Sequence, residues 1–267
     1  MLTTLPPVVK NLLIINIIML FATYVMAGFG WDLNELFALH HWSSDYFRPH
    51  QFVSYMFMHG GFTHLFFNMF ALWMFGRILE QVWGSKRFLI YYIFTGLGAG
   101  LLQMIVVTFH FSGMESAIDA IANSSSPDVF ANFIDEYVPN VYQGIFNQDL
   151  AAWISNPDSS QYMAVALNHC HQLLESSRNV PTVGASGSIF GVLLAFGMLF
   201  PNTELFLLFP PIPIKAKYFV IGYGLIELYM GFSANPSDNV AHFAHLGGML
   251  FGYIMIRYWK KNTNHFY

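Results

Sequence analysis

Six apolar segments, separated by more polar loops, set the strongest limit on what this chain can fold into. A helix needs about 20 mainly apolar residues to cross the hydrocarbon core of a bilayer. Only 10% of the residues are charged, whereas a soluble domain has about 25%. The sequence therefore predicts an all-α, polytopic membrane protein built as a bundle of six transmembrane helices. The expected spans are residues 8–27, 62–79, 88–109, 186–200, 218–232 and 240–259.

The distribution of basic residues predicts how these spans are oriented. Lys and Arg are enriched in the cytoplasmic loops of membrane proteins. If successive spans alternate in direction, every basic residue except Arg48 and Arg178 falls on the same side as the two termini. We therefore expect a multi-pass protein of a bacterial inner (plasma) membrane, with both termini in the cytoplasm. The first apolar segment could also be a signal peptide, but it lacks a clear small-residue cleavage site, and we interpret it as an uncleaved span.

Composition also excludes some classes of function. The net charge is -4, and no basic patch indicates binding to nucleic acid. Cys170 is the single cysteine, so no disulfide can form within the chain. A channel or transporter would be expected to show broken helices in repeated halves, and the sequence contains no internal repeat. Nothing in the sequence indicates the oligomeric state.

A long segment, residues 110–183, separates the third and fourth predicted spans. We expect residues 1–267 to form one membrane domain, with this segment as an extracytoplasmic helical insert. Residues 159–176 have the spacing of a helix with one apolar face. Loops longer than about 12–15 residues are usually functional or disordered, and the many aromatic residues here argue against disorder. We expect a small helical cap over the outer ends of the spans; the alternative is a peripheral unit with no effect on function.

Two glycine-containing motifs place a serine and a histidine inside apolar segments. Ser186 belongs to G-A-S-G at 184–187, and His245 belongs to A-H-L-G-G at 244–248. An ionisable residue inside a membrane is a functional candidate. Ser186 opens a predicted helix, where free backbone N–H groups can stabilise an oxyanion. The predicted topology also places both residues near the outer surface, together with His64 and Asn68.

Simpler interpretations exist for both residues. Ser186 could be a small residue for helix packing, because Gly187, Gly191 and Ala195 recur every four residues. His245 could be a packed, hydrogen-bonded group. The elbow of α/β-hydrolases requires G-x-S-x-G after a strand, and this segment has neither the second glycine nor a strand. The glycines of the two segments would allow their helices to approach closely, which favours a Ser–His pair.

His64 and Asn68 are four residues apart and therefore share one helix face. They could form hydrogen bonds between helices, or donate to a developing oxyanion. A metal centre is a further alternative, but H-E-x-x-H is absent and the H-C-H cluster at 169–171 lacks a second pair at zinc spacing. We expect neither a metal nor another cofactor. Glu80 and Glu227 lie on other helices, so we expect a Ser–His dyad with no acidic residue orienting His245.

With these motifs in this order, the chain resembles the rhomboid family of intramembrane serine proteases. Residues 59–68 are similar to the family's H-x₄-H-x₃-N on the second span. Residues 184–187 are similar to its G-x-S-G, and residues 244–252 to its A-H-x₂-G-x₃-G. His242 could compete for the role of the base, but the glycine spacing fits His245. The resemblance extends over all six spans.

The resemblance implies a role for each matching residue. Ser186 would be the nucleophile and His245 the general base and then the general acid. Phe190 would stack on the imidazole ring of His245. The expected substrates are single-span membrane proteins, cut within the lipid bilayer near its outer surface; the alternative is a catalytically inactive relative that binds membrane clients. His64, Asn68 and the Ser186 amide would form the oxyanion hole, and Gly184, Gly187, Gly248 and Gly252 would allow close helix packing.

The chain departs from the family pattern at two places. The family's Trp-Arg pair in the first outer loop is absent; His50 and Gln51 occupy its place, and Phe47 and Arg48 lie slightly earlier. The insert at 110–183 is also much longer than the family's usual link between the third and fourth spans.

Overall fold

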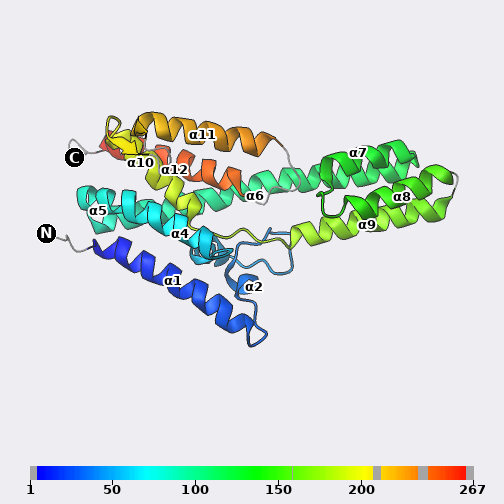
Figure 1. Cartoon of the computed structure of the whole chain (residues 1–267), viewed down its shortest axis with the longest axis horizontal. Helices are drawn as coiled ribbons and strands as arrows, with labels where there is room; N and C mark the ends of the chain where they lie inside the picture. The colour runs from blue at the N-terminus through cyan, green and yellow to red at the C-terminus, as the bar shows by residue number, and fades with distance from the viewer. Residues whose placement is uncertain (1–4, 158, 207–211, 234–239, 263–267) are drawn as a thin grey trace.

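A computed structural model describes residues 5–157, 159–206, 212–233 and 240–262. Within this part of the chain, a helix occurs at each of the six apolar segments (Figure 1). The second segment is one continuous helical stretch that includes a π-helical turn, η2. The elements are α1 (Pro7–Ala27), α4 (Phe62–Ala71), η2 (Leu72–Gly76), α5 (Arg77–Trp83), α6 (Ser85–Ser124), α10 (Ser186–Leu199), α11 (Ala216–Phe232) and α12 (His242–Asn262).

Three described helices are long and apolar enough to cross a membrane: α1, the stretch 62–83 and α6. α10 is apolar but has only 14 residues, because Pro201 follows it and the glycine-containing segment precedes it. α1 and α11 expose many large apolar side chains, as expected for helices that face lipid. The count of six spans stays a prediction.

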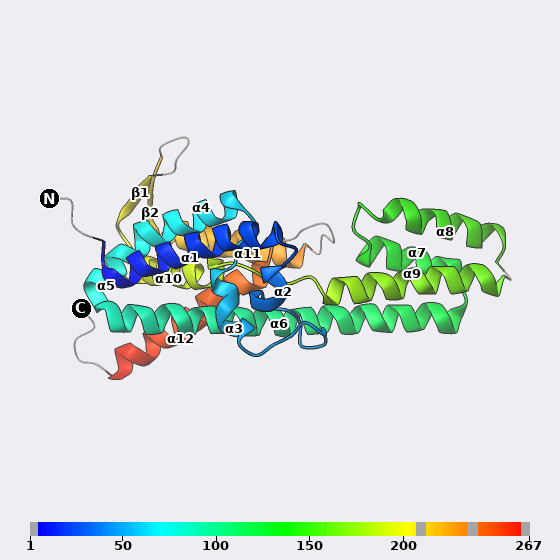
Figure 2. The same cartoon turned by 90° about the horizontal axis from the view of Figure 1, so that it is seen from below.

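The N-terminal end of α1 and the C-terminal end of α12 lie at the same end of the molecule (Figure 1). The junction between α5 and α6 also lies at this end (Figure 2). This arrangement agrees with an even number of crossings. The first four and last five residues lie outside the described part of the chain, and the orientation of the bundle in a membrane stays a prediction.

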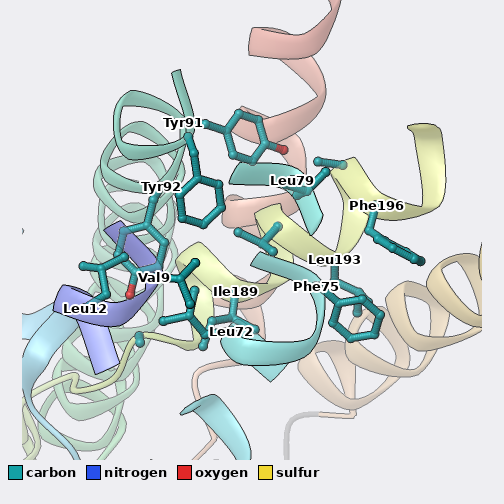
Figure 3. Packing of buried hydrophobic residues seen from close by; sticks show 14 of the residues in the cluster. Val9, Leu12, Leu72, Phe75, Leu79, Tyr91, Tyr92, Ile189, Leu193 and Phe196 are labelled. Carbon is teal, nitrogen blue, oxygen red and sulfur yellow. The ribbon is translucent and has the colours of Figure 1, made fainter. Parts of the chain in front are cut away.

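α10 is the central helix of the bundle and is buried along nearly its whole length. Its apolar side chains pack against α1, η2, α5 and α6, as Figure 3 shows. Its other face meets α12 at Gly187, where a Cβ on Gly248 would overlap the carbonyl oxygen of Gly187. The two helices are therefore in backbone contact. The labelled core residues are Val9, Leu12, Leu72, Phe75, Leu79, Tyr91, Tyr92, Ile189, Leu193 and Phe196.

A buried carboxylate joins the first and second apolar segments. Glu80 accepts hydrogen bonds from the backbone N–H groups of Val8 (2.9 Å) and Val9 (2.8 Å), at the start of α1. Ser85 Oγ donates to the same carboxylate (2.7 Å). The first N–H groups of a helix have no acceptor within the helix, and its N-terminus favours negative charge. Glu80 therefore caps α1 and fixes it against α5.

The loop after α1 is organised by Gln51, which is fully buried. Its side chain accepts hydrogen bonds from the N–H groups of His40 (3.2 Å) and Arg48 (3.1 Å) and donates to the carbonyl of Tyr46 (2.9 Å). Gln51, in the place of the expected Trp-Arg pair, thus closes this loop on itself. The short elements here are α2 (Leu33–Phe37), α3 (Gln51–Ser54) and η1 (Tyr55–Phe57).

Residues 110–183 form a helical arm, which we define as residues 110–124 of α6 together with three further helices. These four pieces surround an apolar core of their own that includes Phe130 and Trp153. Cys170 lies in this core, where burial raises the pKa of its thiol to about 12. The apolar face expected at 159–176 is confirmed, since Ala166 and Leu173 are buried. The additional helices are α7 (Pro127–Tyr137), α8 (Gln143–Ser155) and α9 (Ser160–Arg178).

The expectation of a cap over the ends of the spans is wrong. The arm extends away from the bundle along the long axis of the molecule (Figures 1 and 2). The reason is that α6 does not end at Phe109 but continues to Ser124. The whole helix has 40 residues. At 1.5 Å per residue this helix is about 60 Å long. One face of residues 110–124 is apolar, and its side chains, including Met114 and Ile118, are buried against the other helices of the arm. This packing stabilises the extension of the helix.

Among the described residues, one small β-hairpin lies between α10 and α11. β1 (Glu204–Phe206) pairs antiparallel with β2 (Pro213–Lys215), with Leu205 opposite Ile214. The sequence analysis did not predict these strands. A strand of three residues is too short to show an alternating pattern.

The close contact between α10 and α12 leads to a prediction on stability. We expect Gly248→Ala to lower the melting temperature in detergent, because the added methyl group forces apart two backbones; overpacking typically costs about 1–3 kcal/mol. The control is Gly222→Ala in α11, where a Cβ would meet no atom within 4 Å and alanine favours the helix by about 1 kcal/mol. Equal melting temperatures for the two variants would show that the contact does not limit stability.

Candidate active site

Ser186 is the first residue of α10, and the segment before it is held by the first loop. Leu39 and Thr182 form an antiparallel bridge through two backbone hydrogen bonds of 2.9 and 2.8 Å. The N–H of Gly184 donates to the carbonyl of Tyr55 (3.0 Å), and Gly184 has a φ of +126°, which L-residues rarely adopt. The chain therefore turns sharply into α10 and leaves the N–H of Ser186 without an acceptor in the helix.

The structure brings Ser186 and His245 together from segments 59 residues apart in the sequence. Ser186 Oγ lies 2.8 Å from His245 Nε2, a hydrogen-bonding distance. The backbone contact between Gly187 and Gly248 brings the two helices close enough for this bond. Ser188, the other serine of the motif, is buried and donates to the carbonyl of Tyr92 (2.9 Å) instead.

A stack of aromatic rings holds the imidazole of His245 in one plane. Phe190 stacks on it with ring centroids 4.2 Å apart and an angle of 5° between the planes. Tyr223 of α11 in turn stacks on Phe190, at 5.1 Å and 7°. Parallel contacts on a ring resist its tilting. The histidine is thereby aimed at the serine from a fixed direction.

The expectation that no acidic residue reaches His245 is wrong. Glu227 lies on α11, and its Oε2 accepts hydrogen bonds from Nδ1 of His245 (2.8 Å) and Nδ1 of His242 (2.6 Å). Only 8% of the Glu227 side chain is exposed. The sequence analysis set Glu227 aside because it lies on another helix. Its position in the middle of an apolar helix was a signal that could have identified it.

His64 and Asn68 lie on α4 near the start of α10. Nδ1 of His64 accepts a hydrogen bond from the N–H of Gly60 (3.3 Å), which leaves the proton of the neutral ring on Nε2. His64 Nε2 and Ser186 Oγ lie 2.9 and 3.6 Å, respectively, from the position of a Cβ on Gly184. Asn68 Nδ2 is buried and has no hydrogen-bond partner among the described residues. Both side chains thus offer N–H donors, His64 close to the serine.

Glu227, His242 and His245 are also the described residues that could hold a metal ion, because one donor atom from each lies within 4.8 Å of the others. One carboxylate and two imidazoles are a donor set that binds zinc. In this structure the same atoms are joined by hydrogen bonds, and an Nδ1 that carries a proton cannot coordinate a metal. The expectation that no metal is required stays a prediction.

The arrangement can perform acyl transfer. A hydroxyl lies within hydrogen-bonding distance of an imidazole, as a nucleophile and its general base require. A backbone N–H at a helix start and the side chains of His64 and Asn68 provide donors for a developing negative charge. The site lies inside an apolar bundle, where such interactions are stronger than in water.

Comparison with known proteins shows the family to which the chain belongs. Residues 46–133 and 144–261 match the model of the rhomboid domain. A stretch of 96 residues, 36% of the chain, is 29% identical to the rhomboid protease GluP of Bacillus subtilis (strain 168), covering 18% of that protein. Two Arabidopsis thaliana proteins are also similar: the chloroplastic rhomboid-like protein 11 (33% over 75 residues, 28% of the chain and 25% of the relative) and RHOMBOID-like protein 5 (40% over 53 residues, 20% and 17%).

The chain belongs to the rhomboid family. It is accordingly a multi-pass integral membrane protein, and family membership supports a function of the intramembrane protease type. The chain matches a quarter or less of the length of each of these relatives.

The turn at Gly184 leads to a prediction on the site. We expect Gly184→Ala to slow modification of Ser186 by a fluorophosphonate, because φ is +126° and the new Cβ would lie 2.8 Å from the His64 ring. Gly84→Ala is the matched control, since φ there is +77° but a Cβ would meet no atom within 4 Å. Both variants strain the backbone, and only the first displaces His64. Equally slow modification in both would attribute the effect to general destabilisation.

Proposed function

We propose that this protein is an intramembrane serine endopeptidase. The hydrogen bond of 2.8 Å between Ser186 Oγ and His245 Nε2 is the observation that carries the proposal. It pairs a weak nucleophile with a base that can take its proton. The proposed substrates are single-span membrane proteins, which would enter from the lipid bilayer.

In the proposed mechanism, Ser186 Oγ attacks the carbonyl carbon of the scissile peptide bond while its proton moves to His245 Nε2. The electron pair of the carbonyl π bond moves to the oxygen, which becomes an oxyanion. When the tetrahedral intermediate collapses, the C–N bond breaks and His245 gives its proton to the leaving amine. A water molecule then attacks the acyl-enzyme while His245 takes its proton. The bond between the carbonyl carbon and Ser186 Oγ breaks, and His245 returns the proton to Oγ.

The oxyanion would be stabilised by three donors: the N–H of Ser186 and the side chains of His64 and Asn68. The hydrogen bond from Gly60 to His64 Nδ1 supports this role, because it leaves Nε2–H free to donate. The unpartnered Nδ2 of Asn68 supports it as well. Unsatisfied donors that are already oriented gain most when charge develops beside them.

Cleavage is proposed to occur near the outer surface of a bacterial inner membrane, with both termini in the cytoplasm. Ser186 and His245 each lie in the first turn of a helix whose other end lies with the termini. The distribution of Lys and Arg supports a cytoplasmic position for that end.

An inactive relative that binds membrane clients is the second candidate. It would need none of the proton transfer described above. The Ser186–His245 hydrogen bond favours the protease, because a client-binding protein has no need of an activated serine.

The first test is cleavage of a generic transmembrane substrate by purified protein in detergent. We expect Ser186→Ala and His245→Ala to abolish cleavage, with melting temperatures near that of the wild type. A fluorophosphonate should label Ser186 in the wild type, and EDTA should change neither activity nor labelling. Inhibition by EDTA that zinc reverses would favour metal-dependent chemistry, and a wild type that neither cleaves nor is labelled would favour the inactive relative.

The second test addresses the oxyanion donors. We expect His64→Ala and Asn68→Ala to lower kcat by about 10²–10³, the usual loss when one such donor is removed. The loss should be smaller than that in Ser186→Ala, because the other donors remain. Rates equal to that of the wild type in both variants would show that these side chains serve packing alone.

A further inference from the structure

The position of Glu227 is not explained by a mechanism that requires only a serine and a histidine. A carboxylate in the apolar interior of a membrane protein is costly unless it is paired and hydrogen-bonded. Glu227 is 6% exposed, on a helix whose other described residues are mainly apolar. Both its hydrogen bonds to histidine run to the first turn of α12. The carboxylate is therefore directed at the helix that carries the proposed base.

We propose that Glu227 is a positioning residue for His245, an inference that rests on the proposed function. Its Oε2 accepts the Nδ1–H of His245 (2.8 Å), while Nε2 of the same ring faces Ser186 Oγ (2.8 Å). A neutral imidazole carries one proton, and an ionised carboxylate can only accept. Glu227 therefore fixes the tautomer in which Nε2 holds a lone pair toward the serine. The site acts as a Ser–His–Glu triad.

Glu227 would also stabilise the charge that forms during the reaction. When Ser186 Oγ transfers its proton to Nε2, the imidazole of His245 becomes positively charged. The carboxylate lies at hydrogen-bonding distance from the opposite side of that ring. A nearby opposite charge in a site with little water lowers the energy of the imidazolium.

His242 completes the arrangement by holding the carboxylate. It lies three residues before His245, on the same face of α12, and its Nδ1 is 2.6 Å from the same Oε2. Two donors on one oxygen leave the carboxylate little freedom to rotate. The hydrogen bonds run in the order Ser186, His245, Glu227, His242. Both histidines at the start of α12 therefore have a role in the site.

The competing explanation is that Glu227 only joins α11 to α12. A matched control in the same protein separates the two explanations. Glu80 is also a buried carboxylate (2% exposed) that accepts hydrogen bonds from a neighbouring helix. Its donors, however, are the backbone N–H groups of Val8 and Val9 and not histidine rings. Glu80→Gln should therefore disturb helix packing without affecting His245.

The experiment compares Glu227→Gln, Glu227→Asp and Glu80→Gln in full-length protein in detergent. We expect Glu227→Gln to lower kcat by roughly 10²–10⁴, the upper figure being the loss when the triad aspartate of a serine protease becomes an amide. KM should change little, and fluorophosphonate labelling of Ser186 should slow in parallel. Glu227→Asp should restore part of kcat, because it keeps the charge at a longer distance. Glu80→Gln should lower the melting temperature and leave kcat unchanged.

A second measurement does not depend on activity. Nitrogen-15 NMR of labelled histidine should show His245 as the Nδ1–H tautomer in the wild type. Glu227→Gln should give a mixture of tautomers, because an amide can donate to Nδ1 as well as accept from it. Glu80→Gln should keep the spectrum of the wild type.

The outcomes separate the inference from the proposed function. Normal kcat and a normal His245 spectrum in Glu227→Gln, in a protein that cleaves through Ser186, would overturn the inference and leave the protease intact. Equal loss of kcat in Glu227→Gln and Glu80→Gln would show that Glu227 only joins α11 to α12. A wild type that does not cleave would refute the proposed function, and the histidine spectrum would still decide whether Glu227 sets the tautomer.

Discussion

The site depends on the backbone contact between α10 and α12. Gly187 and Gly248 meet without side chains between them, and a methyl group on Gly248 would overlap the carbonyl oxygen of Gly187. Only this approach brings a serine at the start of one helix within 2.8 Å of a histidine in the first turn of the other. The packing of α1, η2, α5 and α6 around α10 then holds the pair in place. The small residues that allow the two helices to pack closely therefore also determine the geometry of the site.

Two buried glutamates solve the same physical problem in different parts of the bundle. Each carboxylate is buried in the protein, and each is satisfied by N–H donors from another segment. Glu80 uses the free backbone groups at the start of α1. Glu227 uses the rings of His242 and His245. The first interaction stabilises a helix end, and the second lies beside the candidate nucleophile.

The sequence predicted what depends on local pattern. Apolar runs identified the bundle helices, and glycine spacing singled out His245 rather than His242 as the residue that meets Ser186. Properties that depend on three-dimensional arrangement were missed. Glu227 is distant from His245 in the sequence, and no sequence pattern predicts which face of α11 packs against α12. The direction of the arm depends on α6 continuing past Phe109, and the sequence contains no residue there that ends or extends a helix unambiguously.

The continuous course of α6 has a mechanical consequence. Residues 110–124 of this helix form a wall of the arm, and its earlier part touches both helices of the α10–α12 contact, since Ala99 packs against Gly187 and lies next to Gly247. A helix without a break transmits bending and rotation along its length. We expect a displacement of the distal end of the arm to be transmitted along α6 to the junction of α10 and α12. Restraint of the arm would then also limit the relative movement of Ser186 and His245.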